Sequence, residues 1–99
     1  MLVKVLVKRH FKMEKLDEVI ALLKKFRSDA LDQPGYVCGE TLIADGEPEK
    51  LMVISTWQSI EDWNNWKASK TRIENDAMLK IFQEQPTEYT VYRLGSSSN

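Results

Sequence analysis

The sequence predicts an α+β domain in which strands and helices follow the order β-α-β-β-α-β along 99 residues. Four short segments alternate apolar and polar residues with the period of two that is typical of β-strands. Two longer segments repeat their apolar residues every three or four positions, as amphipathic helices do. This is the order of the split βαβ, or ferredoxin-like, plan, in which a four-stranded antiparallel sheet carries both helices on one face.

The first strand is expected over residues 2–11, because apolar side chains occupy every second position from Val3 to Val7. The helix that follows has about five turns. Pro34 and Gly35 are typical residues just past a helix end, so the helix stops before them. Its apolar positions, spaced by three and four, are Leu16, Val19, Ile20, Leu23, Phe26 and Leu31.

A β-hairpin is predicted next. Residues 36–44 and 50–57 have the composition of strands, and residues 45–48 between them, Asp-Gly-Glu-Pro, have the composition of a turn. The chain then enters its second helical segment.

Residues 59–85 are predicted to form this segment in two pieces, with a break near Ala68-Ser69. Ser59 followed by Asp62 resembles a capping box, which begins a helix. The second piece carries an apolar stripe of Ile73, Ala77, Met78, Ile81 and Phe82. Pro86 stops this piece, and residues 87–94 form the last strand. Residues 1–94 therefore form one domain, and residues 95–99, with nothing to bury, are expected to be a disordered tail.

Composition favours a second copy of the chain as a partner. A chain this short hides only about 65% of the surface that its unfolded form exposes. Its apolar fraction of 42% exceeds what a lone two-layer domain of this size easily buries. Strand one also presents Leu2 and Leu6 on its second side. Two such sheets packed face to face would form a closed dimeric barrel, so we expect a homodimer.

Charge and cysteine content exclude several other classes. Fourteen basic residues against fifteen acidic ones give a net charge of −1, so no overall field attracts nucleic acid or a membrane surface. The single Cys38 excludes an intramolecular disulfide, and one histidine with one cysteine cannot assemble a metal site. The N-terminus lacks the apolar core of a signal peptide, and no apolar run is long enough to span a membrane. A cytoplasmic protein is expected.

All three tryptophans, Trp57, Trp63 and Trp66, fall within ten residues at a strand-to-helix junction. Tryptophan is large and rigid and carries one N–H donor, so such a cluster is suited to wall a pocket for a flat ligand. The alternative is that the rings fill a small core. That alternative is favoured for Trp57, while both remain open for Trp66.

Three segments of the chain together have the pattern of a known family. They are Leu16-Asp17-Glu18-Val19, Gln33-Pro34-Gly35-Tyr36 and Ile54-Ser55-Thr56-Trp57-Gln58-Ser59-Ile60-Glu61-Asp62-Trp63. On these residues the chain, over about positions 2–94, resembles the antibiotic biosynthesis monooxygenase (ABM) domains of the dimeric α+β barrel superfamily. The resemblance implies fold and family more strongly than substrate, because most of these residues are structural.

Characterised members of that family include cofactor-independent oxygenases of polycyclic phenols, quinol oxygenases and haem-degrading enzymes. In the first two groups the ionised substrate itself passes an electron to dioxygen, without flavin or metal. The protein supplies a dry cavity, a hydrogen-bond partner for the phenolate and, in some cases, a base. The resemblance therefore implies no bound cofactor and a small aromatic ligand.

The haem-degrading branch fits this chain poorly. Its tryptophan position matches Trp66, but its strand-one asparagine falls on Val7, which donates nothing. Its iron-binding histidine falls near Asp76, and residues 59–85 hold no histidine. Haem degradation is therefore disfavoured.

The candidate pocket residues are Trp66, Trp63 and Phe82 on the helical segment, with Arg9 or His10 at the mouth. His10 is the only histidine, and a surface role is favoured for it over catalysis. Arg9 continues the side of strand one that carries its valines. It is expected either to bind an anionic oxygen or to form a surface salt bridge. No catalytic residue is identified from the sequence.

Further side chains also carry polar groups that could face a ligand. Arg72 and Asp76 are four apart, so they are expected to reach each other, either beside a ligand or as a solvated helix pair. Cys38 is expected to be an inert, half-buried thiol. Three tyrosines, candidates as phenol donors but more commonly packing residues, are Tyr36, Tyr89 and Tyr92.

Two functions of different classes follow. The first is a homodimeric, cofactor-independent monooxygenase of an electron-rich phenol or quinol. The second is a non-catalytic small-molecule-binding or stress-associated dimer whose tryptophans belong to the core.

Overall fold

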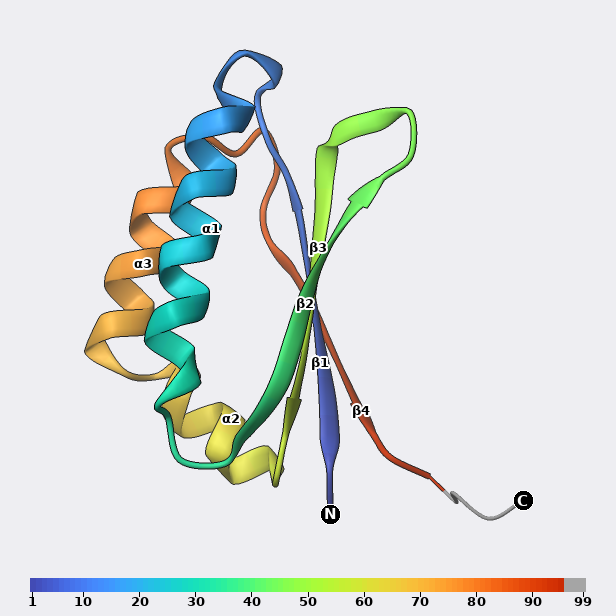
Figure 1. The fold of residues 1–99 in the computed structure, drawn as a ribbon, viewed down its shortest axis with the longest axis vertical. Coiled ribbons are helices and arrows are strands. Elements are labelled where there is room, and N and C mark those ends of the chain that lie inside the picture. Colours follow the sequence, from blue (N-terminus) through green and yellow to red (C-terminus); the bar gives the residue numbers. More distant parts are fainter. Residues whose placement is uncertain (96–99) are drawn as a thin grey trace.

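Four antiparallel strands form one sheet, and helices cover one of its two faces (Figure 1). The computed structural model describes residues 1–95. The predicted β-α-β-β-α-β order and ferredoxin-like class are confirmed, whereas most of the expected tail, residues 96–99, lies outside the described residues. The elements are β1 (Val3–His10), the 3₁₀ helix η1 (Met13–Lys15), α1 (Leu16–Leu31), β2 (Tyr36–Ala44), β3 (Glu47–Trp57), α2 (Ile60–Lys67), α3 (Lys70–Lys80) and β4 (Glu88–Arg93).

The sheet has the strand order β2-β3-β1-β4, so β1 lies at its centre. Val5 of β1 stands opposite Ser55 of β3 and Val91 of β4. Residues opposed in antiparallel strands share a face of the sheet, which fixes the register of all three strands. The β1 residues on the helix-covered face, all buried, are Val3, Val5, Val7 and Arg9.

The core between sheet and helices consists of two clusters. The first joins the β1 valines and Ala30 of α1 to the three tryptophans. The second lies nearer the start of α1, and its buried members are Phe11, Val19, Leu23, Phe26, Leu51 and Leu79. Because burying one such aliphatic side chain is worth about 1.5–3 kcal/mol, these clusters hold the helices on the sheet.

Two serines set the starts of the helices after β3. The Oγ atom of Ser59 accepts a hydrogen bond from the backbone N–H of Asp62 at 3.1 Å and donates one to Asp62 Oδ2 at 3.0 Å. Ser69 Oγ accepts from the N–H of Arg72 at 3.2 Å. The predicted cap at Ser59 and the break near residue 69 are therefore confirmed.

Two predicted boundaries were wrong. The hairpin turn consists of Asp45 and Gly46 alone, with Gly46 at φ +79°, so β3 begins at Glu47 and includes the predicted turn residues 47 and 48. Helix α3 ends at Lys80 rather than near residue 85. Three residues beyond that end, Gln83 pairs with Phe11 in an isolated β-bridge, which turns the chain back toward the sheet.

Most of the apolar stripe predicted for the second helical piece does not face the core, although Phe82, beyond the end of α3, packs against it. Ile73 and Ile81 are 58% and 67% exposed, and Met78 is 40% exposed. The helix instead buries Arg72, Asn75 and Leu79. The spacing of apolar residues located a helix correctly, but contacts made by the polar residues determine which side of it faces inward.

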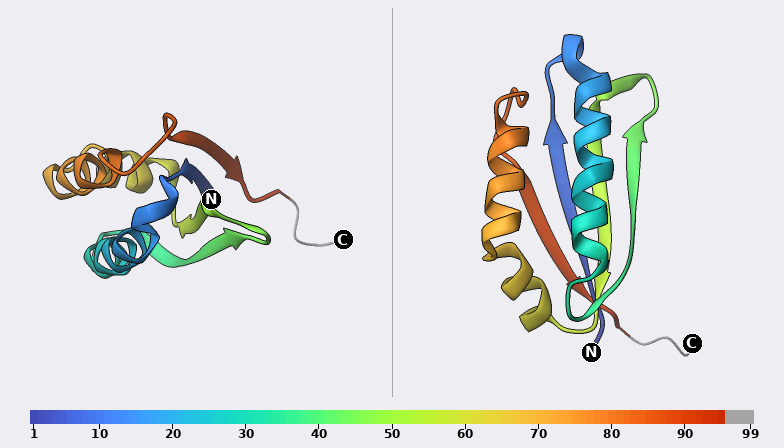
Figure 2. Two further views of the ribbon diagram at one scale, coloured as in Figure 1. Left: turned by 90° about the horizontal axis from the view of Figure 1, so that it is seen from above. Right: turned by 60° about the vertical axis from the view of Figure 1, so that its left-hand side comes forward.

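The second face of the sheet is not covered by any element of residues 1–95, as the view from above shows (Figure 2). Leu6 and Ile54 oppose each other there, both half-buried, and Leu42 and Tyr92 are 41% and 58% exposed on the same side. Within residues 1–95 no helix is long and apolar enough to cross a membrane.

Candidate functional site

A cavity of about 90 Å³ lies between the helix-covered face of the sheet and the helices. Its walls come from α1, α2 and α3 on one side and from β1, β2 and β3 on the other. The lining residues that are exposed, Arg27, Glu40 and Thr41, belong to α1 and β2. The mouth of the cavity is therefore between these two elements.

One wall of the cavity is aromatic. Trp63 and Trp66 project from α2, three residues apart and so on one face of that helix, and are 4% and 5% exposed. Trp57 lies behind them, with its ring centroid 5.8 Å from that of Trp63 and 5.3 Å from that of Tyr36. We call Trp63 and Trp66 the aromatic wall.

Trp57 has a structural role. Its side chain is 1% exposed, and its indole N–H donates a hydrogen bond of 2.9 Å to the Oγ of Ser55 on the same strand. A tryptophan whose only donor is satisfied inside the sheet has little left to offer a ligand. The prediction that Trp57 belongs to the core is consistent with this arrangement.

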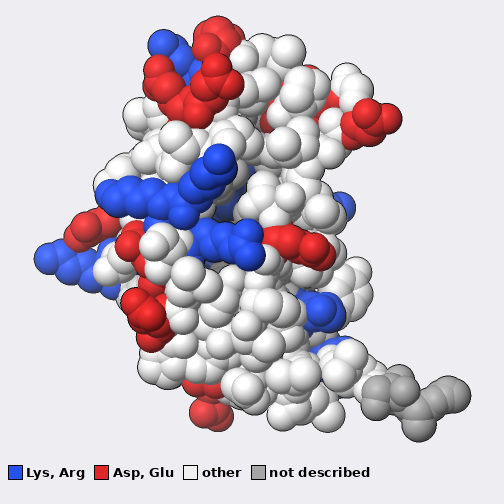
Figure 3. All heavy atoms as spheres, in the orientation of Figure 1, with Lys and Arg blue, Asp and Glu red and all other residues white. Residues whose placement is uncertain are grey.

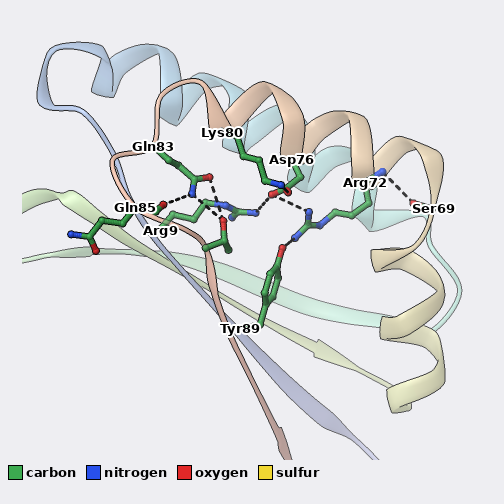
Figure 4. Close-up of polar contacts among 9 residues, drawn as sticks. Arg9, Ser69, Arg72, Asp76, Lys80, Gln83, Gln85 and Tyr89 are labelled. Atoms are coloured by element: carbon green, nitrogen blue, oxygen red, sulfur yellow. Dashed lines mark hydrogen bonds and ion pairs between the residues drawn. The ribbon is translucent and has the colours of Figure 1, made fainter.

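The inner end of the cavity is polar (Figure 4). Arg9 Nη2 lies 3.3 Å from Asp76 Oδ1, and Arg72 Nη1 lies 3.5 Å from the same oxygen. Lys80 Nζ lies 3.3 Å from Asp76 Oδ2, and Arg72 Nη2 donates a hydrogen bond of 3.1 Å to the hydroxyl of Tyr89. We call Arg9, Arg72, Lys80 and Asp76 the cationic cluster, because three positive groups surround one carboxylate.

The charges of this cluster shift the ionisation of its members. Burial alone would raise the pKa of Asp76, but Arg72 and Arg9 outweigh it and hold that pKa below its ordinary value. Burial lowers the pKa of Arg9, and the nearby Arg72 lowers it further. An arginine begins from so high a pKa that it stays protonated, so the cluster carries a net positive charge.

One donor of Arg9 has no acceptor among residues 1–95. Its Nε is buried and unpaired, while the side chain as a whole is 6% exposed. Leaving a buried donor unsatisfied costs about 1–3 kcal/mol. A buried donor left unpaired in this way calls for a specific explanation.

Asn75 completes the polar lining, and sequence reasoning missed it. It is 5% exposed and its Nδ2 donates a hydrogen bond of 3.1 Å to Asp29 Oδ2, which joins α3 to α1. A signal was present in the sequence. Polar residues Arg72, Asn75 and Asp76 recur at three and four positions, which is the spacing of one helix face.

The structure brings together three of the five predicted pocket residues. Arg9, Trp63 and Trp66 line the cavity, but Arg9 is buried beside Asp76 at the inner end and not at the predicted mouth. Phe82 does not, because it follows the end of α3 and packs against the second core cluster. His10 does not either, because successive strand residues point to opposite faces and His10 follows the inward-facing Arg9.

The tyrosines, the Arg72–Asp76 pair and Cys38 lie in different places. Tyr36 lines the cavity and Tyr89 binds Arg72, whereas Tyr92 lies on the uncovered face of the sheet. The Arg72–Asp76 pair forms as expected, with side chains only 10% and 15% exposed, so it is not a solvated helix pair. Cys38 is exposed rather than half-buried.

The residues do not fit a haem site of the kind described above. Val7, at the strand-one position, is 4% exposed within the first core cluster and has no polar atom to offer. Asp76, near the ligand position, is held by three cations. Among residues 1–95, no group of three or more His, Cys, Asp or Glu side chains is arranged to hold a metal ion.

Comparison with known proteins gives one family. Residues 2–83 match the sequence profile described as "Antibiotic biosynthesis monooxygenase". No protein of curated function gives a significant sequence match.

Solved structures share the fold at low sequence identity. A conserved protein from Methanosarcina mazei is 22% identical, with a TM-score of 0.88 over 94% of this chain and 92% of that one. SnoaB from Streptomyces nogalater, a cofactor-independent oxygenase, is 12% identical, with a TM-score of 0.87 over 98% and 96% of the two chains. The protein Rv0793 from Mycobacterium tuberculosis is 13% identical, with a TM-score of 0.86 over the whole of both chains. From the profile match over most of its length, this chain belongs to the antibiotic biosynthesis monooxygenase family.

Proposed function

We propose that this chain is a cytoplasmic, homodimeric monooxygenase that oxidises an electron-rich phenol or quinol with dioxygen and without a bound cofactor. One observation carries the proposal: the buried aromatic wall lines the same cavity as three members of the cationic cluster, Arg9, Arg72 and Asp76. The wall suits a flat ring, and the cations suit an ionised ring oxygen. The fold shared with SnoaB, a cofactor-independent oxygenase, supports the same class.

The proposed reaction balances without an added reductant. A phenol and one dioxygen give a quinone and one water: a ring C–H bond becomes C=O and the hydroxyl loses its hydrogen. The substrate supplies all the electrons, and the protein's part is to favour the electron-rich phenolate and keep bulk water away. Arg9 and Arg72 would stabilise the phenolate oxygen, while Trp63 and Trp66 would hold the ring.

The cavity limits the size of the ligand. A cavity of about 150 Å³ holds one benzene ring, so the 90 Å³ enclosed here suits a single ring at most. A larger ligand would have to extend through the mouth beside Arg27 and Glu40, or widen it. Single-ring hydroquinones are therefore the first substrates to test, and naphthoquinols, which have two rings, test whether the mouth widens.

The homodimer is proposed from the uncovered face of the sheet. Leu6, Ile54, Leu42 and Tyr92 present apolar surface there with no described element against it. Exposed apolar surface on a soluble domain marks an interaction site, and a second sheet is its simplest cover. The cavity lies on the opposite face, so it would stay open in such a dimer.

The test is oxygen uptake by the metal-free protein over a panel of reduced hydroquinones, naphthoquinols and anthrols. Heat-denatured protein gives the autoxidation background. Saturable uptake above that background, lowered at least about tenfold by Trp66→Phe at unchanged stability, would support the proposal. The control variant Lys70→Met alters a side chain that is 91% exposed, so it should retain full activity.

A non-catalytic binding module is the second candidate, and one observation favours it. The chain's only histidine lies outside the cavity, and Asp76, the most buried carboxylate in the lining, has a lowered pKa that makes it a weak base. Saturable ligand binding with no uptake across the panel would favour this candidate over the oxygenase.

A further inference from the structure

We infer that Arg9 and Arg72 make the inner end of the cavity an anion subsite, which takes its ligand as a preformed monoanion in preference to the neutral molecule. The group recognised is a single anionic oxygen function, either a carboxylate or an ionised phenol. The inference rests on the proposed function for the cavity and for the contact of Arg9 and Arg72 with the ligand's oxygen, and it adds the charge state in which the ligand binds.

Positive charges outnumber negative ones around the cavity. Arg9 and Arg72 are 8% and 9% exposed, and both bind one oxygen of the same carboxylate, Oδ1 of Asp76. Lys80 binds the other oxygen of Asp76, so it neutralises much of the negative charge of that carboxylate. Of the other charged lining residues, Arg27 and Glu40 have opposite signs and lie exposed at the mouth. One added negative charge would therefore bring the cavity close to neutrality.

The two arginines have N–H groups with which to bind an oxyanion. Arg9 lines the cavity, and its buried Nε has no acceptor among residues 1–95, so the guanidinium keeps one N–H group that a small rotation would offer to an oxyanion. Arg72 lies beside the aromatic wall, since its Cζ is 5.9 Å from the ring centroid of Trp63. A ring held against the wall would thus carry its oxygen within reach of the cations.

Helix α3 is oriented with polar side chains toward the protein interior. This helix turns Arg72 and Asn75 into the protein and leaves Ile73 and Met78 58% and 40% exposed. Burying polar residues while exposing apolar ones opposes the hydrophobic effect, and such conflicts concentrate at functional sites. In the view of Figure 3, basic side chains cross the middle of the face between helices and sheet, with acidic ones around them.

An anion subsite would also replace the missing base. If the ionised form of a phenol binds tenfold more tightly than the neutral form, the pKa of the bound phenol falls by about one. The cavity then favours the phenolate without a histidine or a free carboxylate to remove the proton.

The test measures binding, without oxygen chemistry. Benzoate and benzamide have nearly the same size and differ in charge, so their affinities for the native protein isolate the effect of the anion. Binding is followed by the indole N–H resonances of Trp63 and Trp66 in the ¹⁵N-labelled protein. A nitrophenol, titrated below and above its own pKa, tests the ionised phenol.

We expect benzoate, ionised nitrophenol or both to bind at least about tenfold more tightly than the matched neutral molecule. Arg9→Met and Arg72→Met should each remove most of this preference, Arg9→Lys should retain part of it, and Lys70→Met should leave it unchanged. A preference for one anion alone identifies the carboxylate or the phenolate as the group recognised.

Equal binding of charged and neutral molecules, or binding of neither, would overturn the inference. So would an anion preference that survives in folded Arg9→Met and Arg72→Met. If neither variant folds, the ratio of benzoate to benzamide affinity in the native protein decides alone. Anion-selective binding without oxygen uptake would reject only the oxygenase, whereas uptake without anion preference would reject only the subsite.

Discussion

Arg9 Nη2 and Asp76 Oδ1 lie 3.3 Å apart although 67 positions separate the two residues in the chain. The contact joins the central strand β1 to α3, so it forms only when that helix is packed on the sheet (Figure 4). Both side chains are more than four-fifths buried. The inner end of the cavity is thus produced by the fold itself rather than by a loop.

Removing the carboxylate should destabilise the protein. Asp76→Asn leaves Arg9 and Arg72 as buried like charges without a counter-ion, which should lower the free energy of unfolding by about 2–4 kcal/mol. The matched control is Glu74→Gln, which alters a half-exposed carboxylate on the same helix and should cost under about 0.5 kcal/mol. Urea denaturation of both variants measures the difference. Equal stability of the two would show that the pairing of Asp76 is weak.

The same carboxylate predicts a dependence of stability on pH. Its pKa in the folded protein lies below the ordinary value near 3.8, because Arg72 and Arg9 outweigh the effect of burial. The folded state therefore binds this proton less tightly than the unfolded state. The contribution should be complete above about pH 5 and be lost as the pH falls through 3.8 toward the lower folded pKa. Asp76→Asn should flatten this part of a pH series of urea midpoints, and an unchanged slope would contradict the assignment.

Gly35 should not tolerate a side chain. It has φ +83°, and a Cβ built there would overlap the carboxylate of Asp62, whose backbone N–H donates to Ser59, the N-cap of α2. Gly46 has nearly the same φ, +79°, with nothing within 4 Å of a Cβ. Gly46→Ala should therefore cost about 1–2 kcal/mol from backbone strain alone. Gly35→Ala should cost at least about 1 kcal/mol more in thermal or urea unfolding, and equal costs would show that Asp62 moves aside freely.

Much of the fold could be predicted from the sequence, because local signals agree with the final structure. The period of two in β1, the cap at Ser59, the helix break near Ser69 and the presence of a turn after residue 44 each depend on a few neighbouring residues. Only part of the candidate site could be predicted from the sequence. Arg9 was placed toward the cavity because its position on the valine side of β1 fixes its direction.

The remainder depended on contacts between distant segments. The apolar stripe of α3 predicted that Ile73 would face inward, yet the helix is held by Arg72, Asn75 and Leu79. Asn75 owes its place to Asp29, 46 positions away on α1, and no local pattern reports such a pair. His10 was assigned to the mouth from proximity to Arg9 in sequence, although alternation along a strand places neighbours on opposite faces.

The last prediction concerns the uncovered face of the sheet. Ile54→Lys places a charge at the middle of that face, beside Leu6 on the neighbouring strand. If two sheets pack together there, the charge must be buried without a partner. The Kd of the dimer should therefore rise by at least about a hundredfold. The control, Ile73→Lys, makes the same substitution at a position 58% exposed on the outer side of α3 and should leave the dimer intact. Light scattering coupled to size exclusion measures both masses. Dissociation by Ile73→Lys but not by Ile54→Lys would place the interface on the helices instead, and a monomeric native chain would remove the dimer from the proposal.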